Sequence, residues 1–291
     1  MKHLLISSLT ALLLILTACA PVQPAASDDS TPGTTSEPSP TPATPDSTED
    51  SPEVEETPTP EPDMEDASWD TNPEALIISA TFCCGFVPQS AVINYIPDAQ
   101  VWGDGRIVWV EQSDDGTRRV LEGQLSLEEL GLLIERIQDA GFFEWEDRYA
   151  NQQVADYADK CINVNLVEQQ KSVCEYYEGA PAEFHEIYDV LSTGAGASGE
   201  DYVPETGFLT VIPLGPTTQI NPADVAGTWD AAEMGISLSE VGEGVWVEGP
   251  ALEAAWAAVN FRPWNPMVQE GENYYLLGLQ IPNLSMAPPP S

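Results

Sequence analysis

A tract of 53 residues, from 21 to 73, is the feature that most limits what this chain can fold into. It contains 12 Pro, 16 Ser or Thr and 14 Asp or Glu, with neither Lys nor Arg. Such a sequence has too little apolar surface to offset the conformational entropy that ordering would remove, so we expect a disordered linker. Its length predicts a spacer between about 40 Å as a coil and about 160 Å as polyproline II. The alternative is an ordinary linker of an exported protein, which has this composition without having to span a particular distance.

The segment before this tract has the layout of a secretory signal. Lys2 is followed by an apolar run from Leu4 to Ala18, and Pro21 and the polar tract come directly after it. A signal h-region has about 7–15 apolar residues, whereas a membrane-spanning helix needs about 20. The run therefore predicts export and not a permanent span.

The end of this leader, "LTAC", resembles the lipobox of bacterial lipoproteins, in which a small residue precedes an invariant cysteine. The resemblance implies cleavage between Ala18 and Cys19 and diacylglyceryl transfer to the Cys19 thiol. Two acyl chains anchor a protein stably, whereas one holds it only marginally. We therefore expect a signal peptide over 1–18, then the lipid anchor and linker over 19–73, on the extracytoplasmic face of the cell membrane. An ordinary signal peptide with an incidental Cys19 is the alternative.

The rest of the chain has the composition of a folded but strongly acidic protein. From Pro73 to Ser291 it carries 34 acidic and 8 basic residues, a net formal charge of −26. A surface this negative repels nucleic acid and anionic lipid headgroups, so neither is an expected partner. Solubility is the simplest use of the charge, and attraction for cations or for a basic partner is the other.

Apolar patterns in this body predict an α+β fold, with antiparallel sheets and a few packing helices. Strands are expected over 74–82, 207–215 and 273–282, and hairpins over 99–112 and 160–179. The first hairpin turns at Gly103–Gly105, where positive φ angles are tolerated, and the second at Gln169–Gln170.

Helix signals are clearest in the middle of the body. Ser126 and Glu129 have the spacing of a capping box at the start of a helix over 127–140, and Gly141 stands where a left-handed residue ends it. Another helix is expected to begin at Pro181.

Two halves are expected, joined by a connector over 192–201. The first is an α+β domain over 74–193, and the second is a C-terminal α+β region over 202–291. "RVLEGQLSLEEL" and "WVEGPALEAAW" share a strand, a Glu-Gly pair and a helix, which indicates two small related modules.

The body also resembles a family of uncharacterised exported bacterial lipoproteins. "GFVPQSAVINYIPDAQVWGDGRIVW" has that family's Gly-Phe-Val-Pro segment before a Gly-Asp-Gly hairpin. "VEGPALEAAWAAVN" and "ENYYLLGLQIP" are similar to its C-terminal part. The resemblance covers most of residues 76–285 and implies architecture alone, because no activity is known for the family.

Export implies an oxidising compartment, where thiols tend to pair. With lipid on Cys19, four thiols remain for pairing: Cys83, Cys84, Cys161 and Cys174. A hairpin turn at Gln169–Gln170 places Cys174 opposite Asn165 and about 13 Å from Cys161, beyond the limit of about 7 Å between bonded Cα atoms. We therefore predict bonds from the 83–84 segment to Cys161 or Cys174. A vicinal Cys83–Cys84 bond and a four-cysteine zinc site are less favoured, the latter because the adjacent pair lacks spacer residues.

The sequence selects no catalytic, metal or cofactor site. His185 is the single histidine after the leader, and its predicted helix face is mostly polar. The acid-rich stretch from Glu144 to Asp159 lacks the spacing of a calcium loop, and there is no G-x-S-x-G motif. Carboxylates that cleave glycosides need not be close in sequence, so no pair stands out.

We therefore expect a lipid-anchored cell-envelope protein whose body is a non-catalytic binding or structural module. Its expected partners are the membrane, through Cys19, and an unknown envelope ligand or protein. The alternatives are a secreted hydrolase that acts through acidic residues, and an envelope inhibitor or partner-docking domain. A deep cleft with converging acids would favour the hydrolase, and a flat apolar patch would favour docking.

Overall fold

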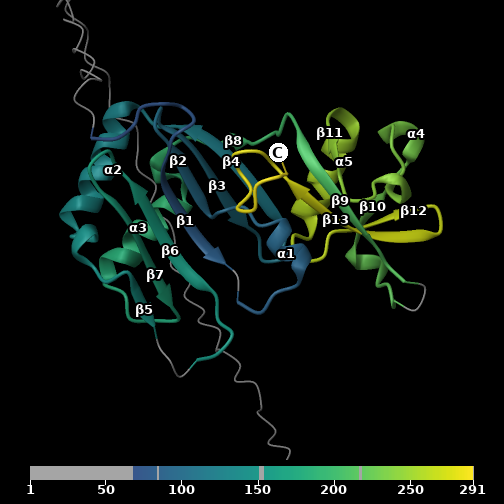
Figure 1. Ribbon diagram of the computed structural model, residues 1–291, viewed down its shortest axis with the longest axis horizontal. Helices are drawn as coiled ribbons and strands as arrows, with labels where there is room; N and C mark the ends of the chain where they lie inside the picture. Colours follow the sequence, from purple (N-terminus) through teal and green to yellow (C-terminus); the bar gives the residue numbers. More distant parts are fainter. Residues whose placement is uncertain (1–67, 84, 151–153, 216–217, 291) are drawn as a thin grey trace, which may run out of the picture. The chain divides into compact units, whose positions relative to one another are not determined.

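The computed structural model describes residues 68–83, 85–150, 154–215 and 218–290, and its fold is mixed α+β with two β-sheets (Figure 1). The predicted fold class is confirmed. The leader and most of the predicted linker lie outside the described residues. Within the described ranges, no helix is long and apolar enough to cross a membrane.

The larger sheet has the strand order β5-β7-β6-β1-β2-β3-β4-β8. Its strands are β1 (Leu76–Cys83), β2 (Ala99–Trp102), β3 (Arg106–Gln112), β4 (Arg118–Gln124), β5 (Arg148–Ala150), β6 (Asp159–Asn165), β7 (Gln170–Tyr176) and β8 (Glu200–Asp201). Its neighbouring strands pair antiparallel except β5 and β7, which are parallel.

The smaller sheet is formed by the C-terminal part of the chain, in the order β10-β12-β13-β9-β11. Its strands are β9 (Gly207–Pro213), β10 (Val225–Thr228), β11 (Val245–Val247), β12 (Met267–Glu270) and β13 (Asn273–Gln280). Only β10 and β12 pair in parallel among these described strands.

The helices differ widely in length. They are α1 (Gln89–Ile93), α2 (Leu127–Asp139), α3 (Ala182–Ser192), α4 (Ala231–Met234) and α5 (Gly249–Phe261), with 3₁₀ turns at Phe142–Glu144, Gly194–Gly196, Pro222–Asp224 and Leu238–Glu240. The predicted capping box of α2 is present, because the Glu129 backbone N–H donates to Ser126 Oγ and the Ser126 N–H donates to Glu129 Oε2. Gly141 has a φ of 78°, as its predicted role requires.

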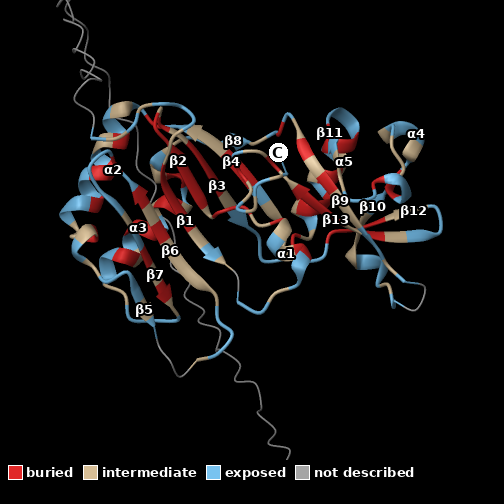
Figure 2. Ribbon diagram, in the orientation of Figure 1, coloured by how far each residue is buried: buried red, intermediate tan, exposed pale blue. Residues whose placement is uncertain are grey.

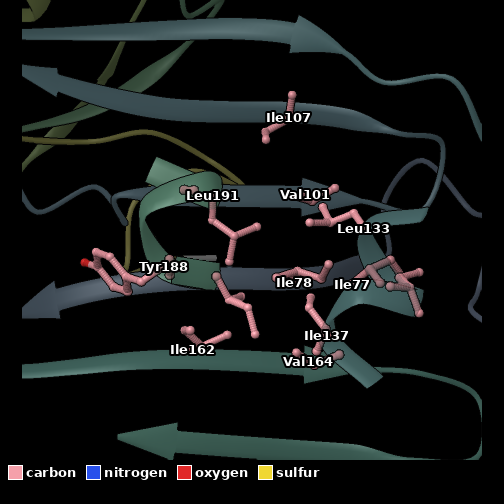
Figure 3. Close-up of a cluster of buried hydrophobic side chains, with 14 of the residues drawn as sticks. Ile77, Ile78, Val101, Ile107, Leu133, Ile137, Ile162, Val164, Tyr188 and Leu191 are labelled. Atoms are coloured by element: carbon pink, nitrogen blue, oxygen red, sulfur yellow. The ribbon is translucent and has the colours of Figure 1, made fainter. Parts of the chain in front are cut away.

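One face of the larger sheet packs against α2 and α3. Figure 3 shows Leu133 and Ile137 of α2 and Leu191 of α3 over the strands, and all three belong to one buried cluster. The strand residues beneath them include Ile78 and Ile162, both fully buried. This apolar layer fixes which side of each strand faces the helices.

The other face of β2, β3 and β4 contributes to a second buried cluster. Trp102, Val108 and Val120 share this cluster with Leu252 of α5 and Leu277 of β13. Because side chains alternate along a strand, β3 supplies Ile107 and Trp109 to the first cluster and Val108 to the second. The centre of the larger sheet is therefore buried on both sides (Figure 2).

The segment predicted as a connector, 192–201, packs closely on the larger sheet. It contains the 3₁₀ turn at Gly194–Gly196 and strand β8. Gly199 lies so near Trp109 that a Cβ there would be 2.4 Å from the indole ring. Glycine is therefore required where this segment crosses the tryptophan.

The β6–β7 hairpin differs in register from the prediction. Asn165 pairs with Gln170, and the Leu166 N–H donates to the Gln169 carbonyl at 2.8 Å, so the turn lies two residues earlier than Gln169–Gln170. That change moves the residue opposite Cys174 by four positions, from Asn165 to Cys161. The prediction that Cys161 and Cys174 do not join depended on the other register and was wrong: they form a disulfide with a Cα–Cα distance of 4.1 Å.

Candidate functional site

A cavity of about 420 Å³ lies beside α1. Its wall includes Phe82 of β1, Ala91 of α1, Val110 of β3, Tyr188 of α3 and Trp264, which follows α5. The volume falls within the range of about 300–1,000 Å³ that is usual for small-molecule sites. Five separate parts of the chain thus enclose a space large enough for an organic molecule.

Asn94 fastens this wall to the smaller sheet. It caps the C-terminus of α1 and is 2% exposed. Its Nδ2 donates to the Leu277 carbonyl at 3.0 Å, and its Oδ1 accepts from the Leu279 N–H at 2.8 Å. At the start of α1, Ser90 Oγ donates to the Trp264 carbonyl at 2.9 Å. Both ends of α1 are therefore held against the C-terminal part of the chain.

Arg118 is the cation of the cavity wall. Its Nε donates to Asn260 Oδ1 at 2.7 Å and its Nη1 donates to the Asn94 carbonyl at 2.8 Å. Its Nη2 is buried and has no hydrogen-bond acceptor among the described residues, although the residue as a whole is partly exposed. Burial lowers the pKa of the guanidinium to about 10, which reflects how poorly the charge is solvated.

Asp98 is the carboxyl group of the wall. The Tyr188 hydroxyl donates a hydrogen bond to Asp98 Oδ2, and the Lys160 ammonium lies 4.6 Å from the centre of the Tyr188 ring. Burial raises the pKa of Asp98, and the Tyr188 hydrogen bond and the Lys160 charge oppose this only in part. Burial and the nearby carboxylate raise the pKa of Tyr188, so its phenol stays protonated and remains a donor.

Tyr95 connects these two groups electrostatically. Its hydroxyl accepts from the Phe82 N–H at 2.7 Å, which leaves its own proton free to be donated. Burial, followed by the charge of Asp98, raises the pKa of Tyr95, whereas the charge of Arg118 lowers it. The cavity wall therefore carries a phenol hydroxyl together with one cation and one carboxyl group among its described residues.

The chemistry of this wall suits binding. Among the lining residues that the structure describes, Arg118 is the only cation, Asp98 is the only carboxyl group, and most others are apolar. A glycosidase uses two carboxyl groups across the scissile bond, and this cavity offers one. In the described parts of the chain, no three His, Cys, Asp or Glu side chains gather as a metal site.

Of the described residues singled out from the sequence, Cys83 lines this cavity, whereas Cys161 and Cys174 do not. Cys19 and Cys84 are not among the described residues. Cys83 lines the cavity and is disulfide-bonded, and its partner is neither Cys161 nor Cys174, because these two hold each other. The predicted links between the 83–84 segment and the β6–β7 hairpin were therefore wrong.

The acidic and histidine candidates also lie elsewhere. His185 Nε2 is 3.5 Å from Oε1 of Glu175, a buried residue of β7. Asp159 lies 2.8 Å from Arg148 in an ion pair.

Sequence reasoning did not select Arg118 or Asp98. The sequence does hold one signal for Arg118, which stands two residues before Val120. Because side chains alternate between the two faces of a strand, both residues share a face, and an apolar Val120 predicts that the Arg118 guanidinium also points inward. Asp98 stands just before β2 and carries no comparable pattern.

Comparison with known proteins identifies part of the chain. Residues 74–194 match the model of a domain of unknown function, DUF6438. This span runs from β1 through α3, so it includes the larger sheet apart from β8. Searches of curated proteins and of solved structures gave no match. The domain match agrees with the resemblance to an uncharacterised family and assigns no activity.

Proposed function

We propose that this protein is an exported, lipid-anchored protein whose body binds a small molecule in the cavity beside α1. The anchor is the diacylglyceryl group expected on Cys19, and the tract that follows is the spacer. The body is a binding module at the outer face of the cell membrane.

The observation that carries the proposal is the cavity itself. It combines an apolar wall with a few polar groups of defined position, which is the usual composition of a small-molecule site. The hydrogen bonds that Asn94 and Ser90 make with the C-terminal part of the chain hold α1 in place, so the fold itself supports the wall. A preformed wall reduces the entropy that binding must overcome.

The hydrolase alternative receives less support from this geometry. A single carboxyl group, Asp98, faces the cavity among the described lining residues, and its oxygen already accepts from Tyr188. Paired-carboxylate hydrolysis needs an acid and a second carboxylate on opposite sides of the bond.

A binding measurement on the full chain tests the proposal. The neutral probe 1-naphthaleneacetamide is titrated into detergent-solubilised protein, and bound probe is measured by equilibrium dialysis and saturation-transfer NMR. We expect saturable binding to one site. Ala91→Trp, which fills the cavity from α1, should weaken binding at least tenfold, whereas Ala223→Trp, on an exposed turn, should not.

Circular dichroism must first show that both variants retain the fold. Equal binding by the parent and by folded Ala91→Trp would place the probe elsewhere and overturn the assignment of this cavity.

A further inference from the structure

We propose that the ligand of this cavity is a small organic acid with an apolar body, and that Arg118 recognises its acidic group. This inference rests on the proposed function, because it names the class of molecule that the same cavity binds.

The first argument is the distribution of charge partners. The body has eight basic residues, and five of them form ion pairs with carboxylates: Arg106, Arg119, Arg136, Arg148 and Lys171. Arg118 lines the cavity and pairs with no carboxylate among the described residues, in a body where acids outnumber bases by 34 to 8. Buried charges in proteins are normally paired, so a guanidinium left unpaired here calls for an anion from elsewhere.

The second argument is the way in which Arg118 is held. Its Nε and Nη1 are fixed by neutral acceptors, Asn260 Oδ1 and the Asn94 carbonyl. These bonds set the plane of the guanidinium without neutralising it. A planar, prepositioned guanidinium on the cavity wall is suited to a carboxylate, which forms short charge-assisted hydrogen bonds with arginine.

The third argument concerns the rest of the wall. Val92, Val110, Ala158 and Trp264 surround the space with apolar surface. A bare inorganic anion would leave this surface in contact with water, whereas an aliphatic or aromatic body would bury it. The volume of about 420 Å³ has room for such a body beside the acidic group.

Tyr95 and Asp98 add a second polar contact on the same wall. Tyr95 retains a hydroxyl proton, and Asp98 faces the same space. A hydroxyl or carbonyl group on the ligand can be recognised there. The site thus has one position for a negative charge and one for a neutral polar group.

A matched pair of probes tests the class of ligand. 1-Naphthaleneacetate and 1-naphthaleneacetamide have the same bicyclic body and differ in charge. Both are titrated into the full chain by equilibrium dialysis at low ionic strength, with detergent alone as the blank. We expect the acid to bind at least tenfold more tightly than the amide, the preference that a charge-assisted hydrogen bond to arginine provides.

Variants of Arg118 and of its neighbour Arg119 test which guanidinium binds the acidic group of the probe. Arg118→Met should abolish the preference for the acid, and Arg118→Lys should retain part of it. Arg119→Met is the matched control, because Arg119 is exposed and pairs with Asp201. It should leave the preference unchanged.

The outcomes separate this inference from the proposed function. Binding of neither probe would overturn the proposed function. Binding of both with equal affinity would leave the proposed function standing and overturn the ligand class. If Arg118→Met fails to fold, the ratio measured with the parent protein and with Arg118→Lys still decides, because equal affinities there refute the inference.

Discussion

Burial of Asp98 disfavours the charged form of its carboxyl group. The carboxyl group lines the cavity and accepts from Tyr188, yet burial raises its pKa above the ordinary value. The folded state therefore holds this proton to a higher pH than the unfolded state does. The unfolding free energy contributed by Asp98 is greatest below its ordinary pKa of 3.8 and falls as the pH rises toward the raised value.

Asp98→Asn should remove this pH dependence, because an amide does not titrate but can still accept from Tyr188. We expect the stability of the variant relative to the parent to improve steadily from about pH 3 toward neutral pH. Urea unfolding across that range measures the difference. Asp115→Asn is the opposite control: hydrogen bonds from Thr117 lower the pKa of Asp115, so that variant should lose relative stability as the pH rises. Parallel curves for Asp98→Asn and the parent would contradict the argument.

Among the helices and strands, the sequence predicts the start of α2 correctly but does not predict the register of the β6–β7 hairpin. The start of α2 depends on Ser126 and Glu129, three residues apart, and both hydrogen bonds of the capping box formed as predicted. The β6–β7 register does not depend on such neighbours. A shift of an even number of residues keeps Ile162 and Val164 on the buried face, so the apolar pattern cannot distinguish the two registers.

In the observed register, β6 also pairs with β1. Ala80 lies opposite Ile162, and Ile78 lies opposite Val164. The cavity was unpredictable for a related reason, because its wall comes from segments as distant as Phe82 and Trp264. Tyr95 and Asp98 are three residues apart in the sequence, and the three-dimensional fold brings Arg118 to the same wall.

The Cys161–Cys174 bond gives a prediction for the hairpin. It closes a loop with a sequence separation of 13 residues, and loops of this size are expected to contribute about 3 kcal/mol to the free energy of unfolding. Replacing both cysteines with alanine should therefore lower that free energy by about 2–3 kcal/mol in denaturant unfolding of the oxidised protein.

Peptide mapping without reduction should recover the 161–174 link directly. Cys84 is then the remaining candidate partner for Cys83, since Cys19 is expected to carry lipid. A peptide that joins Cys83 to Cys161 or Cys174 would contradict this pairing.

At the scale of the whole molecule, the cavity depends on more than the matched domain. Residues 74–194 supply most of its wall, including Arg118 and Asp98, but Pro263 and Trp264 lie beyond that span. Asn260, which positions Arg118, also lies beyond it. The C-terminal region is therefore part of the site, and the domain of unknown function does not enclose the cavity by itself.

A lipid anchor on Cys19, as proposed, would place this cavity beside the membrane. If Cys19 carries diacylglycerol, cells grown with radiolabelled palmitate should incorporate label into the parent protein, and the mature chain should begin at Cys19. Cys19→Ser removes the acceptor thiol, so we expect complete loss of label and of the lipid mass. The Cys161→Ala/Cys174→Ala variant is the control, because it removes two other thiols and should be labelled normally. Label that persists in Cys19→Ser, or a parent chain of unmodified mass, would show that the protein is not lipid-anchored through this residue. The cavity would then have to be interpreted without a membrane beside it.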